Sequence, residues 1–268
     1  MKLEGCNALI TGASAGIGRQ FACQLAGRAR SIILIARREE SLIELADELR
    51  RHRPNLRIYV RKVDLSDFVQ LQDLLDWIDR EKLNVDLLIN NAGLGDSGSF
   101  ANSDPVRNKQ MTLVNITALT SLTRHLLPQM IAKRRGGILN VSSSAGFLPI
   151  PGLAVYAATK AYVASFSEAL RAELRGTGVT VCALCPGPVV TEFQQVAKRK
   201  GVQPDIGPKF LIVTVEQVVR DALAALEAER PLVIPGLAMK LLMLLARSMP
   251  LPALRWLARV SPRTRAIV

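Results

Sequence analysis

A tyrosine and a lysine four positions apart could together perform proton chemistry in this chain. Tyr156 and Lys160 open a segment, continuing to residue 174, that is rich in helix formers with apolar residues at helical spacing. Residues four apart share one helix face, with Cβ atoms about 5–6 Å apart. A phenol has an unperturbed pKa of about 10, and a nearby ammonium lowers that pKa. The pair predicts a tuned phenol, although a surface tyrosine and lysine would show the same spacing.

A glycine-rich turn follows the first predicted strand, 7–11. Gly12, Gly16 and Gly18 form a Gly-x-x-x-Gly-x-Gly pattern that leads into a helical segment, 19–25. Glycines allow a tight turn and close backbone approach, and a helix N-terminus binds a pyrophosphate. The pattern differs from the commoner Gly-x-Gly-x-x-Gly, and a plain strand–helix turn is the alternative. Its position between strand and helix favours a dinucleotide phosphate site.

The end of the second strand predicts which dinucleotide is bound. NAD enzymes usually carry an acid there, whereas a 2′-phosphate requires arginine. This chain has Arg37 and Arg38 and no acid before Glu39. We expect Arg37 to bind the 2′-phosphate of NADP, helped by Arg38 or Arg19. The alternative is that Arg37 and Arg38 simply begin a solvated helix. Asp64, after the third strand, either accepts a hydrogen bond from adenine or caps the helix that begins near residue 66.

Short apolar runs alternate with longer helical segments along the 268 residues, of which 49% are hydrophobic. Continuously apolar strands indicate a parallel sheet covered on both faces. We predict an α/β fold: one doubly wound, Rossmann-type parallel sheet of about seven strands with helices on both faces. A single domain, 1–235, would include a polar, mobile loop, 192–212, as a substrate lid, followed by an extension, 236–268. The predicted strands are 7–11, 31–36, 57–63, 87–90, 137–142, 180–184 and 231–234.

Composition narrows the partners and the compartment. The net charge of +12 favours anionic partners, but aromatics make up only 4% of the chain and no reading motif appears, which argues against nucleic acid. Cys182 and Cys185 lie three apart on a predicted strand and so face opposite ways, which argues against a metal site or a redox pair. His52 and His125 have no partner pattern. We predict a cytoplasmic protein, because the cysteines suit a reducing compartment, the first strand begins too early for a secretory signal, and no apolar run could span a bilayer.

Further motifs resemble those of the short-chain dehydrogenase/reductase family in its short, single-domain form. The resemblance covers residues 3–234. Ser143 fits the catalytic serine, since its thirteen-residue offset from Tyr156 distinguishes it from Ser142 and Ser144. The motifs that carry the resemblance are the glycine turn, Asn90-Asn91-Ala92-Gly93, Asn115, Val141 to Gly146 with its three serines, Tyr156 with Lys160, Pro186-Gly187, Val189 and Thr191.

The resemblance implies hydride transfer between NADPH and a carbonyl or secondary alcohol. Tyr156 would donate a proton to the carbonyl oxygen while Ser143 orients that oxygen. Lys160 would bind the nicotinamide ribose and lower the pKa of Tyr156, and Asn115 would hold a water that links Lys160 to solvent. No metal is implied. The implied cofactor-binding residues are Gly12, Ser14, Gly16, Ile17, Gly18, Arg37, Arg38, Asp64, Leu65, Asn91, Ala92, Gly93, Tyr156, Lys160, Pro186, Gly187, Val189 and Thr191.

The extension 236–268 carries six basic residues and no acid. Residues 237–247 are apolar almost all round, and Trp256 follows in a second short helical segment. The first helix either packs over the substrate pocket, forms a subunit interface, or lies on an anionic membrane with peripheral contact. Each reading favours a lipophilic substrate of lipid metabolism, such as an acyl ketone, another keto-lipid, a steroid or a retinoid. We expect a homodimer or homotetramer.

Two other functions remain as alternatives. The first is an NAD-dependent alcohol dehydrogenase of the same family. The second is an NADP-binding sensor or scaffold with little turnover, which we would expect to have lost Ser143, Tyr156 or Lys160. All three residues are present, and the sequence therefore favours an enzyme.

Overall fold

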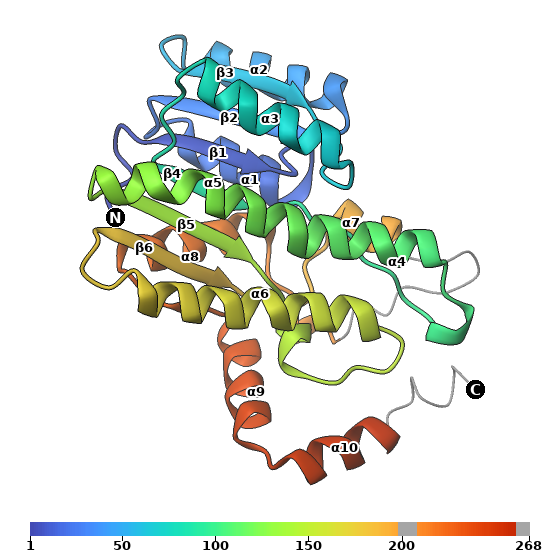
Figure 1. The fold of residues 1–268 in the computed structure, drawn as a ribbon. Helices are drawn as coiled ribbons and strands as arrows, with labels where there is room; N and C mark the ends of the chain where they lie inside the picture. The colour runs from blue at the N-terminus through green and yellow to red at the C-terminus, as the bar shows by residue number, and fades with distance from the viewer. Residues whose placement is uncertain (198–207, 261–268) are drawn as a thin grey trace.

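Seven parallel strands form one sheet at the centre of the molecule (Figure 1). The structure, a computed structural model, describes residues 1–197 and 208–260. The strand order is β3-β2-β1-β4-β5-β6-β7, so the direction of winding reverses between β1 and β4. The strands are β1 Asn7–Thr11, β2 Ser31–Ala36, β3 Arg57–Lys62, β4 Leu87–Asn90, β5 Gly136–Val141, β6 Val179–Leu184 and β7 Leu232–Val233.

Helices cover both faces of the sheet. Side chains of α1, α2 and α8 pack on one face, and those of α3, α4, α5 and α6 pack on the other. The doubly wound parallel α/β fold is thus confirmed. The helices are α1 Gly16–Leu25, α2 Glu39–His52, α3 Phe68–Arg80, α4 Pro105–Thr112, α5 Leu119–Ala132, α6 Ala154–Glu173, α7 Glu192–Val196, α8 Val215–Glu227, α9 Leu237–Ser248 and α10 Leu251–Val260. Shorter turns are η1 Phe100–Asn102, η2 Leu113–Ala118, η3 Ser144–Phe147 and η4 Lys209–Leu211.

Burial follows position in the sheet. Every residue of β2, β4, β5 and β6 is buried, because helices cover these strands on both sides. The edge strand β3 is only partly buried. Four of the predicted strands differ in their bounds: β3 ends one residue early, β5 lies one residue earlier, β6 starts one residue earlier and β7 shrinks to two residues.

Asp67, and not Asp64, caps the helix after β3. Its carboxylate accepts hydrogen bonds from the backbone N–H groups of Val69 at 2.9 Å and Gln70 at 3.2 Å, which satisfies two free donors at the start of α3. Asp64 instead accepts from the backbone N–H of Ser66 at 2.9 Å and from its hydroxyl at 2.7 Å. Of the two roles expected for Asp64, that of helix cap was wrong, because a second aspartate lies next to the first helical residue. The contact with adenine stays a prediction.

The expected loop 192–212 is not irregular throughout. It begins with the short helix α7 and ends with the turn η4. The side chain of Phe193 from α7 reaches Tyr156, with 5.8 Å between ring centroids. The basic cluster 198–200 within this segment lies outside the described residues.

The extension forms α9 and α10, which reach away from the sheet in Figure 1. Met239, Met243 and Ala246 bury one face of α9 against Leu211, with Phe147 beside them. This packing agrees with the reading that places the first helix against the body of the protein. Among the described residues, no helix has the length and apolarity to cross a bilayer.

Candidate active site

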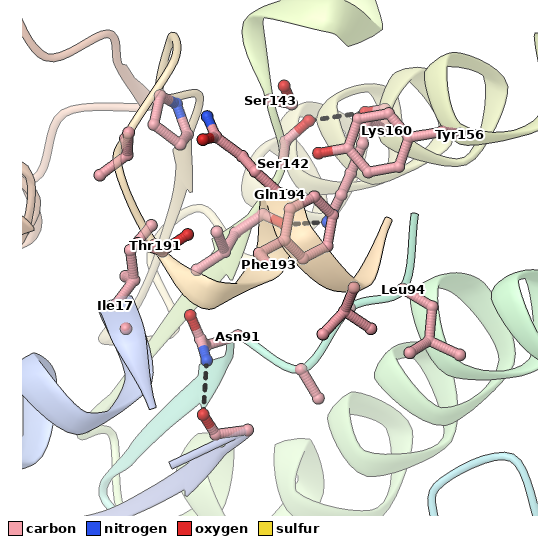
Figure 2. Close-up of a pocket in the computed structure, with 18 of the residues that line it drawn as sticks. Ile17, Asn91, Leu94, Ser142, Ser143, Tyr156, Lys160, Thr191, Phe193 and Gln194 are labelled. Atoms are coloured by element: carbon pink, nitrogen blue, oxygen red, sulfur yellow. Dashed lines mark hydrogen bonds between the residues drawn. The ribbon is translucent and has the colours of Figure 1, made fainter. Parts of the chain in front are cut away.

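A cavity of about 660 Å³ lies where the sheet changes its direction of winding. Its walls come from the segments that follow β1, β2, β4, β5 and β6, together with residues of α6, α7 and α9. In open α/β sheets this crevice at the carboxyl ends of the strands is where ligands bind. Figure 2 shows side chains from these separate elements pointing into one space. All the predicted site residues line the cavity except Gly18 and Asn115.

The glycine turn forms one wall of the cavity. Gly12 and Gly16 have φ of +66° and +52°, which side chains disfavour. A Cβ at Gly18 would lie 2.2 Å from the Gly12 carbonyl oxygen, so Gly18 lets α1 pack against the turn from behind. Asn91 holds the turn, because its side-chain amide donates to the carbonyl oxygens of Thr11 at 2.9 Å and Gly12 at 3.2 Å.

The N-terminus of α1 suits an anion. No side chain caps this helix, and its first turn contains no acidic residue. The backbone N–H groups and the positive end of the helix dipole therefore face the cavity without a protein counter-charge. Together with the cradle that the glycines leave, these features fit the pyrophosphate of a dinucleotide.

Two arginines mark the far end of the cavity. An Arg37 guanidinium nitrogen lies 3.9 Å from a carboxylate oxygen of Asp64. Arg38 donates to the Ser14 hydroxyl at 3.3 Å and lies 2.9 Å from the Glu192 carboxylate of α7. Both arginine side chains are about half exposed, at 52%. The alternative helper, Arg19, pairs with Glu48 of α2 and does not line the cavity.

Ser143, Tyr156 and Lys160 meet at the other end (Figure 2). Tyr156 and Lys160 share one face of α6, and the Lys160 ammonium nitrogen lies 5.8 Å from the centre of the Tyr156 ring. Lys160 donates to the Val141 carbonyl at the end of β5, at 2.8 Å. Ser142 is buried and donates to the Lys160 backbone carbonyl at 2.6 Å. The Ser143 hydroxyl lines the cavity and accepts a hydrogen bond from the Ala145 N–H at 3.1 Å.

The protein alone does not lower the pKa of Tyr156. Burial raises the pKa of this half-buried phenol to about 12, and the hydrogen bond with Ser143 opposes that shift. Burial lowers the pKa of Lys160 to about 8. Removal of water is the larger of these two influences on Tyr156. The lowering of the Tyr156 pKa by Lys160, with help from the positive ring of the oxidised cofactor, stays a prediction. At neutral pH the phenol keeps its proton.

Asn115 is buried in a π-helical turn behind the cavity. Its side-chain nitrogen donates to the Leu94 carbonyl and to the Thr159 hydroxyl, both at 2.9 Å. Its side-chain oxygen accepts from the Leu94 N–H at 2.8 Å. These bonds tie the segment after β4 to α6, so Asn115 positions two walls of the site. Its expected water remains a prediction.

Packing of the first helix of the extension over the substrate pocket was one of the expectations, but the sequence did not single out the residues that form the apolar side of the cavity. Phe193 of α7 and Met239, Leu242 and Met243 of α9 line it. A Cβ on Gly187 would approach the Met239 side chain to 2.5 Å, so this glycine makes room for α9. The Gly187–Met239 contact joins positions 52 residues apart in the sequence, so no local sequence pattern predicts it. Among the described residues no cluster suited to a metal ion is present.

The sequence model of the short chain dehydrogenase family matches residues 6–201 of this chain. The chain belongs to the short-chain dehydrogenase/reductase family. A sulfoacetaldehyde reductase of Chromohalobacter salexigens is 39% identical over 190 residues, which are 70% of this chain and 74% of that protein. A very-long-chain 3-oxoacyl-CoA reductase of Anas platyrhynchos is 34% identical over 225 residues, 82% of this chain and 68% of that protein.

The solved structures agree with this assignment. A short-chain dehydrogenase of Sphingobium yanoikuyae in complex with NADPH is 32% identical and superposes with a TM-score of 0.80, covering 89% of this chain and 91% of that one. The protein is thus an NAD(P)-dependent oxidoreductase of this family that acts on alcohol or carbonyl substrates.

Proposed function

We propose that this dehydrogenase/reductase uses NADPH to reduce the carbonyl group of a lipophilic substrate, with Tyr156 as the proton donor. The observation that carries the proposal is the joint placement of Ser143, Tyr156 and Lys160 at one end of a cavity whose wall is the glycine turn. NADPH, when bound, supplies the hydride. The reverse reaction would oxidise a secondary alcohol.

Each of the three side chains has a separate task in this proposal. Tyr156 carries a proton at neutral pH because burial raises its pKa to about 12, and it gives that proton to the carbonyl oxygen. Ser143 donates a hydrogen bond to the same oxygen and so fixes its direction. Lys160 is buried and anchored at Val141, which aims its ammonium group at the space beside the Tyr156 ring, where it binds ribose hydroxyls.

NADP is the preferred cofactor in this proposal. Arg37 and Arg38 line the end of the cavity that lies next to β2, the place from which a 2′-phosphate is bound. The terminal residue of β2 is Ala36, so no acid stands there to select NAD. Asp64 lies beside Arg37. One of its carboxylate oxygens accepts hydrogen bonds from Ser66, and the other would contact the adenine.

An apolar reaction end supports a lipophilic substrate. Most charged residues of the described lining gather near β2: Arg37, Arg38, Asp64 and Glu192. At the other end, the described lining contains one charged residue, Lys160. Apart from the serines and Gln194, the walls around Tyr156 are apolar, which favours burial of a hydrocarbon chain or ring system. They are formed by Leu148, Ile150, Leu153, Phe193, Met239, Leu242 and Met243.

The parts of the chain divide these tasks. Residues 1–235 would bind the cofactor and perform the reaction, 192–212 would close over the substrate, and 236–268 would complete the apolar wall. The short helix α7 supports the role of a lid, because its Phe193 already contacts Tyr156. We keep the expectation of a homodimer or homotetramer, which size-exclusion chromatography with light scattering would check.

A substrate panel tests the proposal directly. Long-chain 3-oxo esters, a steroid ketone, a small ketone and sulfoacetaldehyde are offered with NADPH and, in parallel, with NADH, and the decrease in nicotinamide absorbance is followed. We expect turnover with NADPH, and higher kcat/KM for the lipophilic ketones. Equal use of NADH would contradict the role of the arginines. Tight binding of NADPH without turnover of any carbonyl would favour a sensor or scaffold.

A further inference from the structure

The outward face of α9 is an uncovered apolar stripe. Leu237, Leu241, Leu244 and Leu245 recur at helical spacing and expose 74, 52, 62 and 66% of their surface. We call these four residues the leucine stripe. The opposite face of the same helix is buried through Met239, Met243 and Ala246. Contiguous exposed leucines are unusual on a protein surface unless another surface covers them.

Exposed cations border the leucine stripe. Lys240 and Arg247 lie two helical turns apart on α9, along one edge of the stripe. The Arg247 guanidinium also lies over the Phe147 ring, 5.1 Å from its centre. Arg255 and Arg259 follow on α10, where Trp256 is 62% exposed. No described acidic residue forms an ion pair with any of these four cations, and the chain has no acid from residue 231 onward. The apolar surface is thus combined with an unbalanced positive charge.

We propose that the leucine stripe and its bordering cations dock α9 onto an anionic lipid surface. A helix with an apolar face, cations beside it and a tryptophan nearby lies in the headgroup layer, where leucines enter the acyl boundary and cations meet phosphate. Tryptophan is enriched at this depth. A second copy fits less well, because two such faces would bring like charges together with no acid between them.

The position of α9 gives this docking a consequence for the reaction. Its buried residues Met239 and Met243 and the partly exposed Leu242 line the cavity, so a single helix would separate the lipid surface from the reaction site. A ketone dissolved in the membrane would therefore reach the protein beside the cavity. This consequence rests on the proposed function, whereas the docking itself does not.

Vesicle flotation with the full-length protein tests the docking without any substrate. Vesicles of phosphatidylcholine alone are compared with vesicles that also contain phosphatidylglycerol, at low and at high salt. We expect flotation with phosphatidylglycerol at low salt, weakened at high salt because the cations are screened. Leu241→Ser with Leu245→Ser should abolish it. Lys240→Gln with Arg255→Gln should weaken it roughly thirtyfold.

Matched variants separate this surface from the general charge of +12. Phe68→Ser with Val69→Ser removes two apolar side chains that are 74% and 65% exposed on α3. Lys109→Gln with Arg124→Gln removes two exposed cations from α4 and α5. Both control proteins should float like the wild type. None of these substitutions touches the cavity, so turnover of a small soluble ketone reports whether each variant is folded.

Three results would overturn the proposal. The first is wild-type flotation of the leucine-stripe variant. The second is an equal loss of flotation in the control variants, which would assign binding to net charge. The third is no flotation of the wild type together with a smaller oligomer for the leucine-stripe variant, which would make α9 an interface between copies. A failure to reduce ketones would leave the flotation result intact and would count against the proposed function alone.

Discussion

Burial raises the pKa of Tyr156 and lowers the pKa of Lys160, because in both side chains it favours the neutral form. The pKa of Tyr156 rises to about 12 and that of Lys160 falls to about 8. At neutral pH the phenol is protonated, which suits proton donation during reduction. Oxidation requires a phenolate, so we expect that direction to need a higher pH or the positive charge of an oxidised nicotinamide.

Substitution of Tyr156 by phenylalanine tests its chemical role. The ring that packs on Phe193 stays while the hydroxyl is lost, so we expect kcat to fall by about 10²–10⁴-fold with little change in NADPH affinity. Stopped-flow turnover and fluorescence titration of NADPH measure the two quantities. Tyr162→Phe on the same helix is the control, because this tyrosine bonds Thr120 outside the cavity. Near-normal turnover of Tyr156→Phe would refute the assignment.

Lys160 should make stability depend on pH. Its pKa is about 10.5 when unfolded and about 8 when folded, so between these values the unfolded chain binds the extra proton and stability rises with pH. We expect the free energy of unfolding of the wild type to increase, relative to Lys160→Met, as the pH rises from about 8 to about 10.5. Urea denaturation of both proteins across this range measures the difference. A constant difference would contradict the lowered pKa.

Among the elements, α7 is linked to the loop after β2 through one ion pair. Arg38 lies between the Ser14 hydroxyl and the Glu192 carboxylate. In the proposed function, Glu192 would compete with the 2′-phosphate of NADP for the Arg38 guanidinium group. This competition would couple the expected lid to the end of the cavity that selects the cofactor.

Glu192→Gln should therefore improve NADPH binding. An exposed ion pair contributes about 0.2–1 kcal/mol, so we expect the Kd of NADPH to fall by about 1.5- to 5-fold while that of NADH stays constant. Fluorescence titration of both cofactors measures this. Glu44→Gln, an exposed site on α2 with the same change in charge, should leave both affinities unchanged. An equal gain for NADH would mean that Arg38 does not contact the phosphate.

Local patterns predicted most of the elements and much of the cavity. The strands and the glycine turn follow from contiguous residues, because buried strands are continuously apolar and a tight turn requires glycine at Gly12. The cap of α3 was misplaced because Asp64 and Asp67 are both suitable by type, and only the start of the helix decides between them. The contacts of Phe193 and Met239 depend on how distant segments pack, which no local pattern records.

At the scale of the whole molecule, α9 lies between the cavity and the outer surface that carries the leucine stripe. Leu242 lines the cavity, and its neighbour Leu241 belongs to the outward leucine stripe. Leu242→Asn should raise the KM for a lipophilic ketone by about fivefold, since it replaces apolar surface at the substrate, and should leave the KM for a small ketone unchanged. Steady-state kinetics with both substrates measure this. Leu241→Asn should alter neither KM, and an equal effect of both changes would contradict the division.

The contact between Gly187 and Met239 also joins two parts of the chain with different constraints. Gly187 lies within the stretch 6–201 that the family shares, whereas Met239 lies beyond it. We therefore expect the apolar wall to differ among relatives independently of the residues around Tyr156, provided that position 187 keeps no side chain. The last helices would then act as an exchangeable cassette, and grafting them between relatives should change which ketones are accepted without changing how they are reduced.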